Sequence, residues 1–456
     1  MGEKIIIGAS LGNCVHVAGI YRFLSLAEQY HYTSYFLGPA ISIDQLIQCI
    51  KEKQPHRVIV GYRLSEDTAH LLFNEFRQQL EQNHLLNQSI FILSCTPALV
   101  PLAQSIGIFK YIFSGYESFD DILESIHHAP KESTPDQKYP ATLPERILYK
   151  KPFPLLRHHF GRPSVQETIE GVTRISESKT IDIISLGPDQ NAQEFFFEPE
   201  KMKEKESGAG GVPLRKREDL EQIFAASRTG NYPLLRCYSG TNHLEEWANL
   251  LHETIHIAWG AVPLTWYSRL DGRSQRSLEV AITENQRAMQ KYVSLGIPLE
   301  VNESHQWSLR DAPDSVACAA FFLAAYNAKK AGAKYYIAQY MLNTPSGISP
   351  RADLAKMLAK KTLIAPLQNE SFIVYTQTRG GLAHFSPNLN IAKGQLGAST
   401  ALGLTLKPDI IHVVGYSEAD HLIYPDELIE SAQIVQGTIK DLLSDFPEME
   451  YDPVIQ

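Results

Sequence analysis

Short β-rich runs alternate with stretches of helical length along nearly the whole 456-residue chain. Within the first 130 residues, five such runs are separated by amphipathic stretches; the runs are residues 5–8, 32–37, 57–61, 89–94 and 110–113. Parallel strands need long crossover connections, usually helices, so this alternation favours a parallel sheet. The sequence therefore predicts an α/β domain over residues 1–130, with a doubly wound parallel sheet of flavodoxin-like size.

The alternation resumes after a proline-rich stretch, residues 131–162, which we interpret as an interdomain linker. Seven further β-rich runs follow: 181–186, 233–238, 262–267, 297–302, 334–339, 371–377 and 409–415. Strands separated by helices in this number predict a (β/α)₈ TIM-type barrel over residues 163–456, with the missing strand near 166–174 or 362–366. The charged segment 198–217 is expected to be a mobile surface loop, since a loop so polar should not be buried.

Composition excludes several classes of protein. No apolar run approaches the roughly 20 residues that span a bilayer, and no secretory signal is visible, so we expect a cytoplasmic protein without a membrane partner. The five cysteines form no C-x-x-C pair, which argues against a cysteine zinc site or an iron–sulfur cluster. A net charge of −9 without a long basic stripe argues against nucleic acid as a partner.

The loop between the first expected strand and helix reads L-G-N-C-V-H-V-A-G over residues 11–19. It resembles the D-x-H-x-x-G motif of cobalamin-binding (B12-binding), Rossmann-like domains, with Cys14 at the Asp position and Gly19 at the Gly position. The resemblance implies that His16 binds the cobalt of the corrinoid as its lower ligand. Neutral imidazole is a good metal ligand whose other nitrogen is usually held by a neighbour, and a thiol such as Cys14 is only a weak acceptor for that role.

Two further positions of that family can be assigned by register. Its S-x-L falls on Tyr62-Arg63-Leu64, and its Gly-Gly falls on Ser94-Cys95. In the family these small residues line the tunnel for the nucleotide tail, because glycine lets the backbone approach a ligand closely. Larger residues here should hinder tail binding, or require a corrinoid with a different lower base.

Residues 230–440 resemble the large (epsilon) subunit of glutamate mutase, which is a barrel. The resemblance rests on L-L-R-C-Y at 234–238, D-G-R-S-Q-R at 271–276, R-D-A-P-D-S at 310–315 and P-D-I-I-H-V-V-G-Y at 408–416. It implies that Arg236, Arg273 and Arg310 clamp substrate carboxylates, for which the planar guanidinium is suited. The alternative is that each arginine pairs with a structural acid such as Asp271, Asp311 or Asp314.

One departure affects the expected chemistry. The family carries a glutamate that takes the substrate amine, and Gln339 stands at that position here. An amide can orient a substrate but cannot accept a proton at neutral pH. Either the substrate lacks an ammonium group, or a neighbour such as Glu303 or His305 supplies the base.

These resemblances predict an adenosylcobalamin-dependent carbon-skeleton isomerase of the glutamate mutase (methylaspartate mutase) type, acting by radical rearrangement on a small dicarboxylate or amino acid. The alternatives are a corrinoid-binding or sensing protein that has lost mutase activity, or a corrinoid methyl-transfer protein. Because the related barrels pair, a homodimer is expected.

Overall fold

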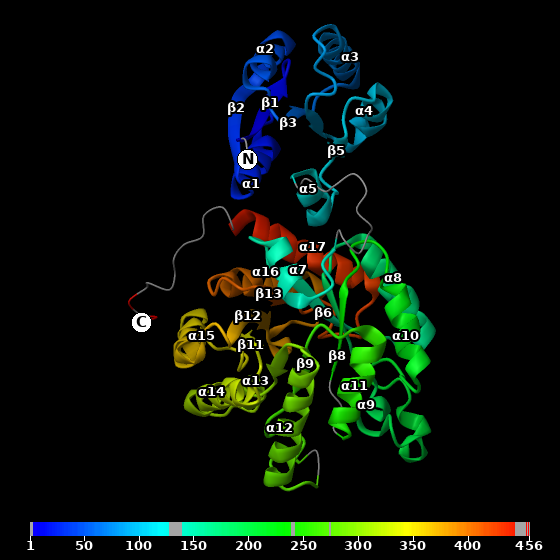
Figure 1. Cartoon of the computed structure of the whole chain (residues 1–456), viewed down its shortest axis with the longest axis vertical. Coiled ribbons are helices and arrows are strands. Elements are labelled where there is room, and N and C mark those ends of the chain that lie inside the picture. The colour runs from blue at the N-terminus through cyan, green and yellow to red at the C-terminus, as the bar shows by residue number, and fades with distance from the viewer. Residues whose placement is uncertain are drawn as a thin grey trace. The chain divides into compact units, whose positions relative to one another are not determined.

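A computed structural model describes residues 3–126, 139–238, 242–272 and 275–442, together with residues 453 and 455. The chain divides into two compact units, residues 1–131 and 132–456 (Figure 1). Each unit is considered by itself below.

The N-terminal unit is a five-stranded sheet in which every paired neighbour is parallel, in the order β2-β1-β3-β4-β5. Its strands are β1 (Lys4–Leu11), β2 (Tyr32–Ile41), β3 (Arg57–Tyr62), β4 (Ile90–Cys95) and β5 (Tyr111–Phe113). Its helices are α1 (Ala18–Gln29), α2 (Ile43–Lys53), α3 (Glu66–Gln82), α4 (Val100–Ile106) and α5 (Phe119–Ile126). The order in which strands are added to the sheet reverses between β1 and β3. In open α/β sheets, the carboxyl ends of the strands at such a switch point form the usual binding crevice.

Side chains of successive strand residues point to opposite faces of this sheet. Val58, Val60 and Tyr62 of β3 belong to the apolar cluster that includes helices α2 and α3, whereas Ile59 belongs to the cluster that includes α1. The buried Arg57 extends from the α1 side and donates to the carbonyl oxygen of Ser125 near the end of α5. A cation at a helix C-terminus is favourable, so Arg57 fixes α5 to the sheet.

The C-terminal unit is an eight-stranded parallel sheet that nearly closes into a barrel, in the order β8-β7-β6-β13-β12-β11-β10-β9. The strands are β6 (Leu155–Phe160), β7 (Ile183–Leu186), β8 (Leu234–Cys237), β9 (Gly260–Val262), β10 (Leu299–Val301), β11 (Tyr335–Leu342), β12 (Ile373–Gly380) and β13 (Ile410–His412). Strands β8 and β9 form no ladder; a hydrogen bond of 2.8 Å from the Ala258 amide to the Leu235 carbonyl spans the opening.

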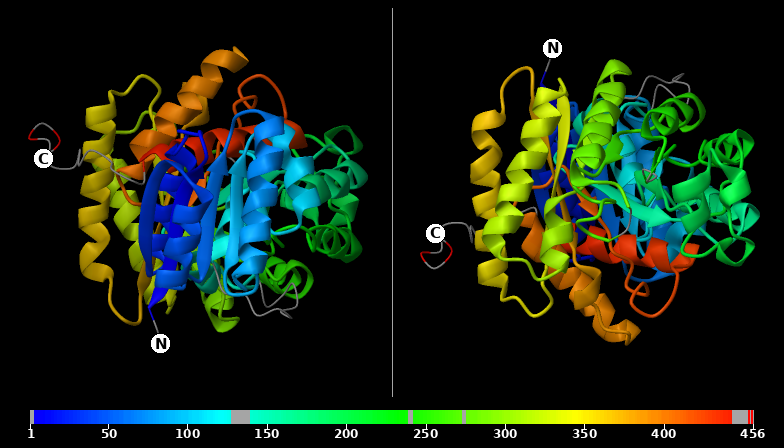
Figure 2. Two further views of the ribbon diagram at one scale, coloured as in Figure 1. Left: turned by 90° about the horizontal axis from the view of Figure 1, so that it is seen from above. Right: turned by 90° about the horizontal axis from the view of Figure 1, so that it is seen from below.

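Helices surround these strands on the outside of the sheet and at one end of the barrel (Figures 1 and 2). They are α7 (Leu143–Lys150), α8 (Val165–Ser178), α9 (Gln190–Phe195), α10 (Arg217–Ala226), α11 (Leu244–Ile255), α12 (Leu278–Ser294), α13 (Ser304–Leu309), α14 (Asp314–Lys330), α15 (Pro350–Ile364), α16 (Leu389–Leu404) and α17 (Pro425–Leu442). Helix α7 packs Leu143 and Ile147 against the strand residues Leu155, Ile183 and Ile337. One end of the barrel interior is therefore filled with apolar side chains.

The missing eighth strand is β6, which lies inside the stretch interpreted as a linker. The two expected locations were wrong: residues 166–174 lie in α8, and residues 362–366 lie at the end of α15 and in the following 3₁₀ turn. Strand β6 reads L-L-R-H-H-F, and its polar central residues conceal it from a search for apolar runs. Residues 132–138 of the expected linker lie outside the described residues.

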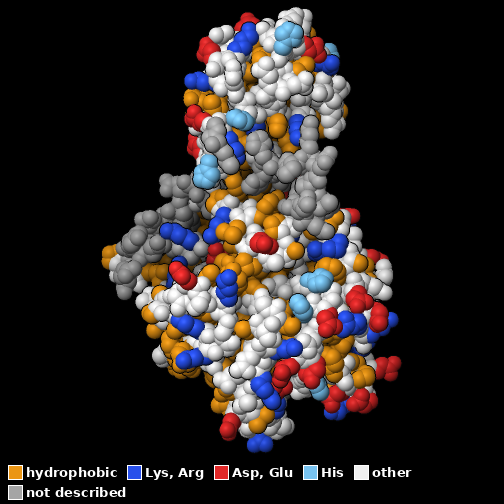
Figure 3. Space-filling model, in the orientation of Figure 1, with side chains coloured by type: hydrophobic (Ala, Val, Ile, Leu, Met, Phe, Trp, Pro, Cys, Tyr) orange, Lys and Arg blue, Asp and Glu red, His pale blue; other side chains and the backbone are white. Residues whose placement is uncertain are grey.

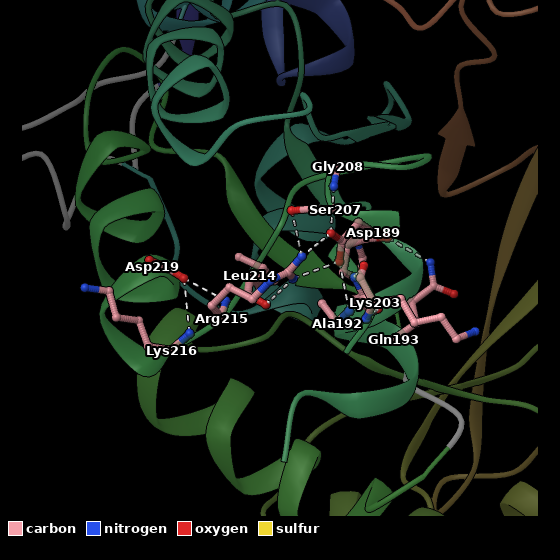
Figure 4. A network of polar contacts seen from close by, with 12 residues as sticks. Asp189, Ala192, Gln193, Lys203, Ser207, Gly208, Leu214, Arg215, Lys216 and Asp219 are labelled. Carbon is pink, nitrogen blue, oxygen red and sulfur yellow. Dashed lines mark hydrogen bonds and ion pairs between the residues drawn. The ribbon is translucent and has the colours of Figure 1, made fainter. Parts of the chain in front are cut away.

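The charged segment 198–217, which follows β7 and α9, was expected to be an exposed loop. It is instead partly buried (Figure 4). The fully buried Asp189 accepts from the Gly208 amide at 2.9 Å and from Arg215 Nη1 at 3.0 Å. Gly211 lies so close to Gly187 that an added Cβ would come within 2.0 Å of its carbonyl oxygen. Asp189 thus compensates the charge of Arg215, and glycine permits the close backbone approach, so a sequence rich in charge still packs.

Candidate functional site

The carboxyl end of β1 in the N-terminal unit presents His16 to solvent. His16 is exposed in the loop between β1 and α1, and its Nδ1 lies 3.6 Å from Sγ of the buried Cys14. Within the described part of the chain, no protein group occupies its Nε2. The predicted pair is therefore brought together, with one ring nitrogen held by a weak partner and the other available to a ligand.

The other predicted corrinoid residues separate onto two faces. Tyr62 and Cys95 are fully buried in the apolar cluster opposite α1, and burial, reinforced by Glu117, raises the pKa of the Cys95 thiol to about 11. Leu64 is exposed beyond the end of β3. A Cβ added to Gly19 of α1 would meet Ser94 Oγ at 3.3 Å, which places these two residues on the α1 face.

The small residue of β3 on the α1 face is Gly61, one position before the predicted Tyr62. A Cβ on Gly61 would come within 2.7 Å of Ile20 Cδ1, and a Cβ on Gly8 within 2.8 Å of Leu24 Cδ1. Ile20 and Leu24 thus fill the space between α1 and the sheet. His16 thus leaves Nε2 open to a ligand, whereas a group could enter beside Gly61 only if α1 moved.

The C-terminal unit holds a cavity of about 510 Å³, within the range of about 300–1,000 Å³ usual for small-molecule sites. Three arginines converge on it from strands β6, β8 and β12, and its lining contains no aspartate, glutamate or lysine from the described residues. The lining residues are Arg157, His159, Arg236, Tyr238, Asn302, His305, Gln306, Leu309, Gln339, Met341, Arg379, Leu382 and Ala383.

Glu300 of β10 compensates two of these arginines from behind the cavity. Its Oε2 accepts from Arg236 Nη2 at 3.0 Å and from Trp259 Nε1 at 2.6 Å, and lies 3.9 Å from Arg157 Nη1. Burial alone would raise the pKa of Glu300, but Arg236 and Arg157 outweigh it and hold the pKa below its usual range. Glu300 is therefore a carboxylate, and its Oε2 is already engaged by protein donors.

Arg379, near the end of β12, has no such partner. Its Nε donates to the Gly380 carbonyl at 3.2 Å, and no carboxylate of the described residues lies within 4 Å of its guanidinium. Burial lowers the pKa of Arg379, against the opposing attraction of Glu418 and Glu300. Its two terminal nitrogens are thus free to bind an anion in the cavity.

A hydrogen-bond chain links the polar side chains of the cavity. Arg157 Nη1 donates to Gln377 Oε1 at 2.9 Å, and Gln377 Nε2 lies 2.9 Å from Gln339 Oε1 and 3.3 Å from Glu300 Oε1. Gln339 Nε2 lies 3.2 Å from His305 Nδ1. Gln339 and Gln377 are register partners on β11 and β12, so the sheet itself sets this contact.

The structure brings together three of the six predicted barrel residues: Arg236, Gln339 and His305 line the cavity. Arg310 is exposed and stacks on Trp266, with the guanidinium carbon 4.1 Å from a ring centroid, and does not line it. Arg273 lies outside the described residues. The structural-acid alternative holds in part for Arg236, although its partner is Glu300 rather than an aspartate.

Glu303 is buried outside the cavity lining, and protein donors engage its carboxylate. Its Oε2 accepts from the amides of Leu264 and Thr265, each at 3.1 Å, and its Oε1 from Trp307 Nε1 at 3.0 Å. Burial raises the pKa of Glu303 despite these hydrogen bonds. This carboxylate holds the loop after β9, so the expectation that it acts as a base in the site is not supported by its position.

Sequence reasoning missed Arg157, His159 and Arg379. The first two lie on the unrecognised strand β6, and Arg379 follows an expected strand by two residues. A signal was present: each arginine interrupts or ends a β-rich run, where a charged side chain requires an anionic partner or ligand.

No protein-family model and no curated protein matches this chain. Among solved structures, a cobalamin-binding protein from Desulfitobacterium hafniense DCB-2 is 21% identical over 24% of this chain and 52% of its own, with a TM-score of 0.22. The apo form of OxsB, a cobalamin-dependent S-adenosylmethionine radical enzyme, is 9% identical over 95% of this chain and 56% of its own, with a TM-score of 0.21.

OxsB with aqua-cobalamin and S-adenosylmethionine bound is 10% identical over 96% of this chain and 56% of its own, with a TM-score of 0.22. The chain spans about half the length of each of these structures. TM-scores this low leave the function to be argued from the site itself.

No helix among the described residues is long and apolar enough to cross a membrane. The same residues contain no group of three or more His, Cys, Asp or Glu side chains placed to hold a metal ion. The face shown in Figure 3 carries acidic and basic side chains interspersed, without a continuous basic stripe.

Proposed function

We propose that the chain is a corrinoid-dependent enzyme whose N-terminal unit, a flavodoxin-like domain, holds cobalamin and whose barrel binds a small carboxylate. The observation that carries the proposal is His16: an exposed imidazole at the carboxyl end of β1, with Nε2 available and Nδ1 at Cys14 Sγ. Its orientation resembles that of metal-bound histidines, whose second nitrogen contacts a neighbouring group.

The barrel supplies the second half of the proposal. Buried guanidiniums bind carboxylates strongly because they form paired, charge-assisted hydrogen bonds in a medium of low dielectric constant. When bound as adenosylcobalamin, the cofactor would supply a carbon radical by homolysis of its cobalt–carbon bond. The finer proposal is a carbon-skeleton isomerase, in which Arg157, Arg236 and Arg379 position the substrate and the cavity limits access of water.

The test is spectroscopic. Full-length protein is mixed with adenosylcobalamin, freed of excess cofactor, and examined by ultraviolet–visible absorption and, after photolysis, by electron paramagnetic resonance of cobalt(II). We expect a stoichiometric chromophore with one axial nitrogen, whose splitting changes when the protein carries ¹⁵N-histidine. His16→Ala should lose this signature, and His70→Ala, an exposed histidine of the same unit, should retain it.

A protein that retains no corrinoid under these conditions would contradict the proposal. Retained cobalamin with His16 on cobalt, but no rearrangement of any small dicarboxylate or amino acid offered, would favour the alternative of a corrinoid-binding or sensing protein. Transfer of a methyl group from methylcobalamin would favour a methyl-transfer protein. Size-exclusion chromatography with light scattering tests the proposed homodimer.

A further inference from the structure

The orientation of every amide in the hydrogen-bond chain of the cavity can be deduced from its two charged ends. Arginine can only donate hydrogen bonds, so Gln377 must turn its oxygen toward Arg157. Its nitrogen then donates to Gln339 Oε1 and to Glu300, which can only accept. Gln339 must therefore turn its nitrogen toward His305.

This orientation determines the protonation of His305. Because Gln339 Nε2 donates to Nδ1, the proton of the neutral ring must sit on Nε2. The Gln306 amide nitrogen is placed 3.3 Å from His305 Nε2; two donors cannot face each other, so this amide must turn its oxygen toward the ring. Burial, together with Arg379, lowers the pKa of His305 to about 3, which agrees with a permanently neutral ring.

The second imidazole of the cavity is fixed in the same way. Arg157 Nη2 lies 2.8 Å from His159 Nε2 and can only donate, so His159 is an acceptor at Nε2. Burial and Arg157 lower its pKa well below the ordinary value. Both histidines are therefore neutral at physiological pH, and the positive charge of the cavity comes from its three arginines.

We infer that the cavity takes an anion that carries no ammonium group, bound by the terminal nitrogens of Arg379. The inference rests on the proposed carboxylate site and specifies its substrate class. A buried ammonium is normally compensated by a carboxylate, and no carboxylate lines the cavity among the described residues. A cation placed beside three guanidiniums would be repelled.

Glutarate and L-glutamate provide a matched pair of probes, since they differ only in the α-ammonium group. Titration calorimetry on the full-length protein should show glutarate binding at least about 10-fold more tightly than glutamate, a ratio set by the repulsion of the extra charge. Arg379→Met should lose both. Binding of glutamate as tight as that of glutarate would overturn the inference.

Gln339→Glu should reverse the preference, because a carboxylate at this position can accept from an ammonium. The exposed Gln286→Glu, which adds the same charge outside the cavity, should leave the ratio unchanged. Thermal unfolding of each variant shows whether it is folded. Should Gln339→Glu fail to fold, the two probes on the unmodified protein still decide the question.

The tautomer has its own measurement. In ¹⁵N-histidine-labelled protein, His305, assigned by its absence in His305→Gln, should show an unprotonated Nδ1 and a protonated Nε2 with no titration between pH 6 and pH 8. A ring that titrates near the ordinary histidine pKa of about 6.5 would overturn the assignment.

Failure of this inference and failure of the proposed function are distinguishable. Tight glutamate binding with His16 on cobalt would leave the corrinoid proposal standing and change only the substrate class. Glutarate selectivity without corrinoid retention would do the reverse. Binding of neither probe would overturn both this inference and the carboxylate part of the proposed function.

Discussion

The two units present their candidate ligands in opposite ways. His16 of the N-terminal unit is exposed on a loop, with one weak contact to Cys14, whereas the arginines of the barrel stand on strands and reach a cavity enclosed by hydrogen-bonded neighbours. An exposed imidazole can bind an incoming group without losing contacts within the protein. Glu300 instead compensates the buried guanidiniums of Arg157 and Arg236 in advance, which orients these two side chains before any ligand arrives.

The largest expected effect is on the barrel. Glu300→Gln removes the carboxylate that contacts Arg236 and lies near Arg157, leaving two buried cations uncompensated. We expect a loss of about 3–5 kcal/mol in the free energy of unfolding, measured by urea denaturation. Arg174→Met, which removes an exposed ion pair with Asp426 in the same unit, should change it by less than about 1 kcal/mol. Equal losses of stability in the two variants would show that Glu300 is no more important than an exposed ion pair, and that the barrel arginines do not depend on it.

Asp189→Ala tests whether a buried carboxylate also holds the loop after β7 in place. It leaves the Ala192 and Gly208 amides and Arg215 without their acceptor (Figure 4). A loss of about 1.5–3 kcal/mol is expected, as for hydrogen bonds to a charged group. Faster amide exchange at Gly208 and new proteolytic cleavage within residues 198–215 should accompany it. Unchanged exchange would show that other contacts hold the segment.

Gly61→Ala should have a smaller effect in the N-terminal unit. The new Cβ would meet Ile20 Cδ1 at 2.7 Å, so α1 or the Ile20 side chain must shift. Overpacking of this kind costs about 1–3 kcal/mol. The double variant Gly61→Ala/Ile20→Ala should show less than the sum of the two single effects, because the smaller side chain makes room. Additive effects would contradict the contact between these residues.

His16→Ala should affect stability least. The side chain is exposed, and its one hydrogen-bonding contact is with a thiol, so the free energy of unfolding of the ligand-free protein should change by no more than about 0.5 kcal/mol. The same variant is expected to lose the axial nitrogen signal of bound cobalamin. A large loss of stability would show that His16 supports the fold, which would weaken its assignment as a ligand.

The sequence by itself determined the order of elements in both units. Strand and helix alternate as the hydrophobic pattern predicts, because parallel strands require crossover helices and both faces of such sheets are covered. The hydrophobic pattern did not predict β6, because Arg157, His158 and His159 replace the apolar residues by which a strand is recognised. That strand is polar because it lines the cavity, so the missed element is part of the candidate site.

The sequence also predicted His16, Arg236, Gln339 and His305 as site residues. Each was predicted separately, from a resemblance or from the cost of burying a charge. Only the tertiary structure decided which side chains meet. The period of two along β3 and β4 turned Tyr62 and Cys95 away from α1 and placed Gly61 and Ser94 beside it. The register of β11 with β12 and the curvature of the sheet joined Arg157 to His305 through two amides, and such contacts between distant segments leave no local trace in a sequence.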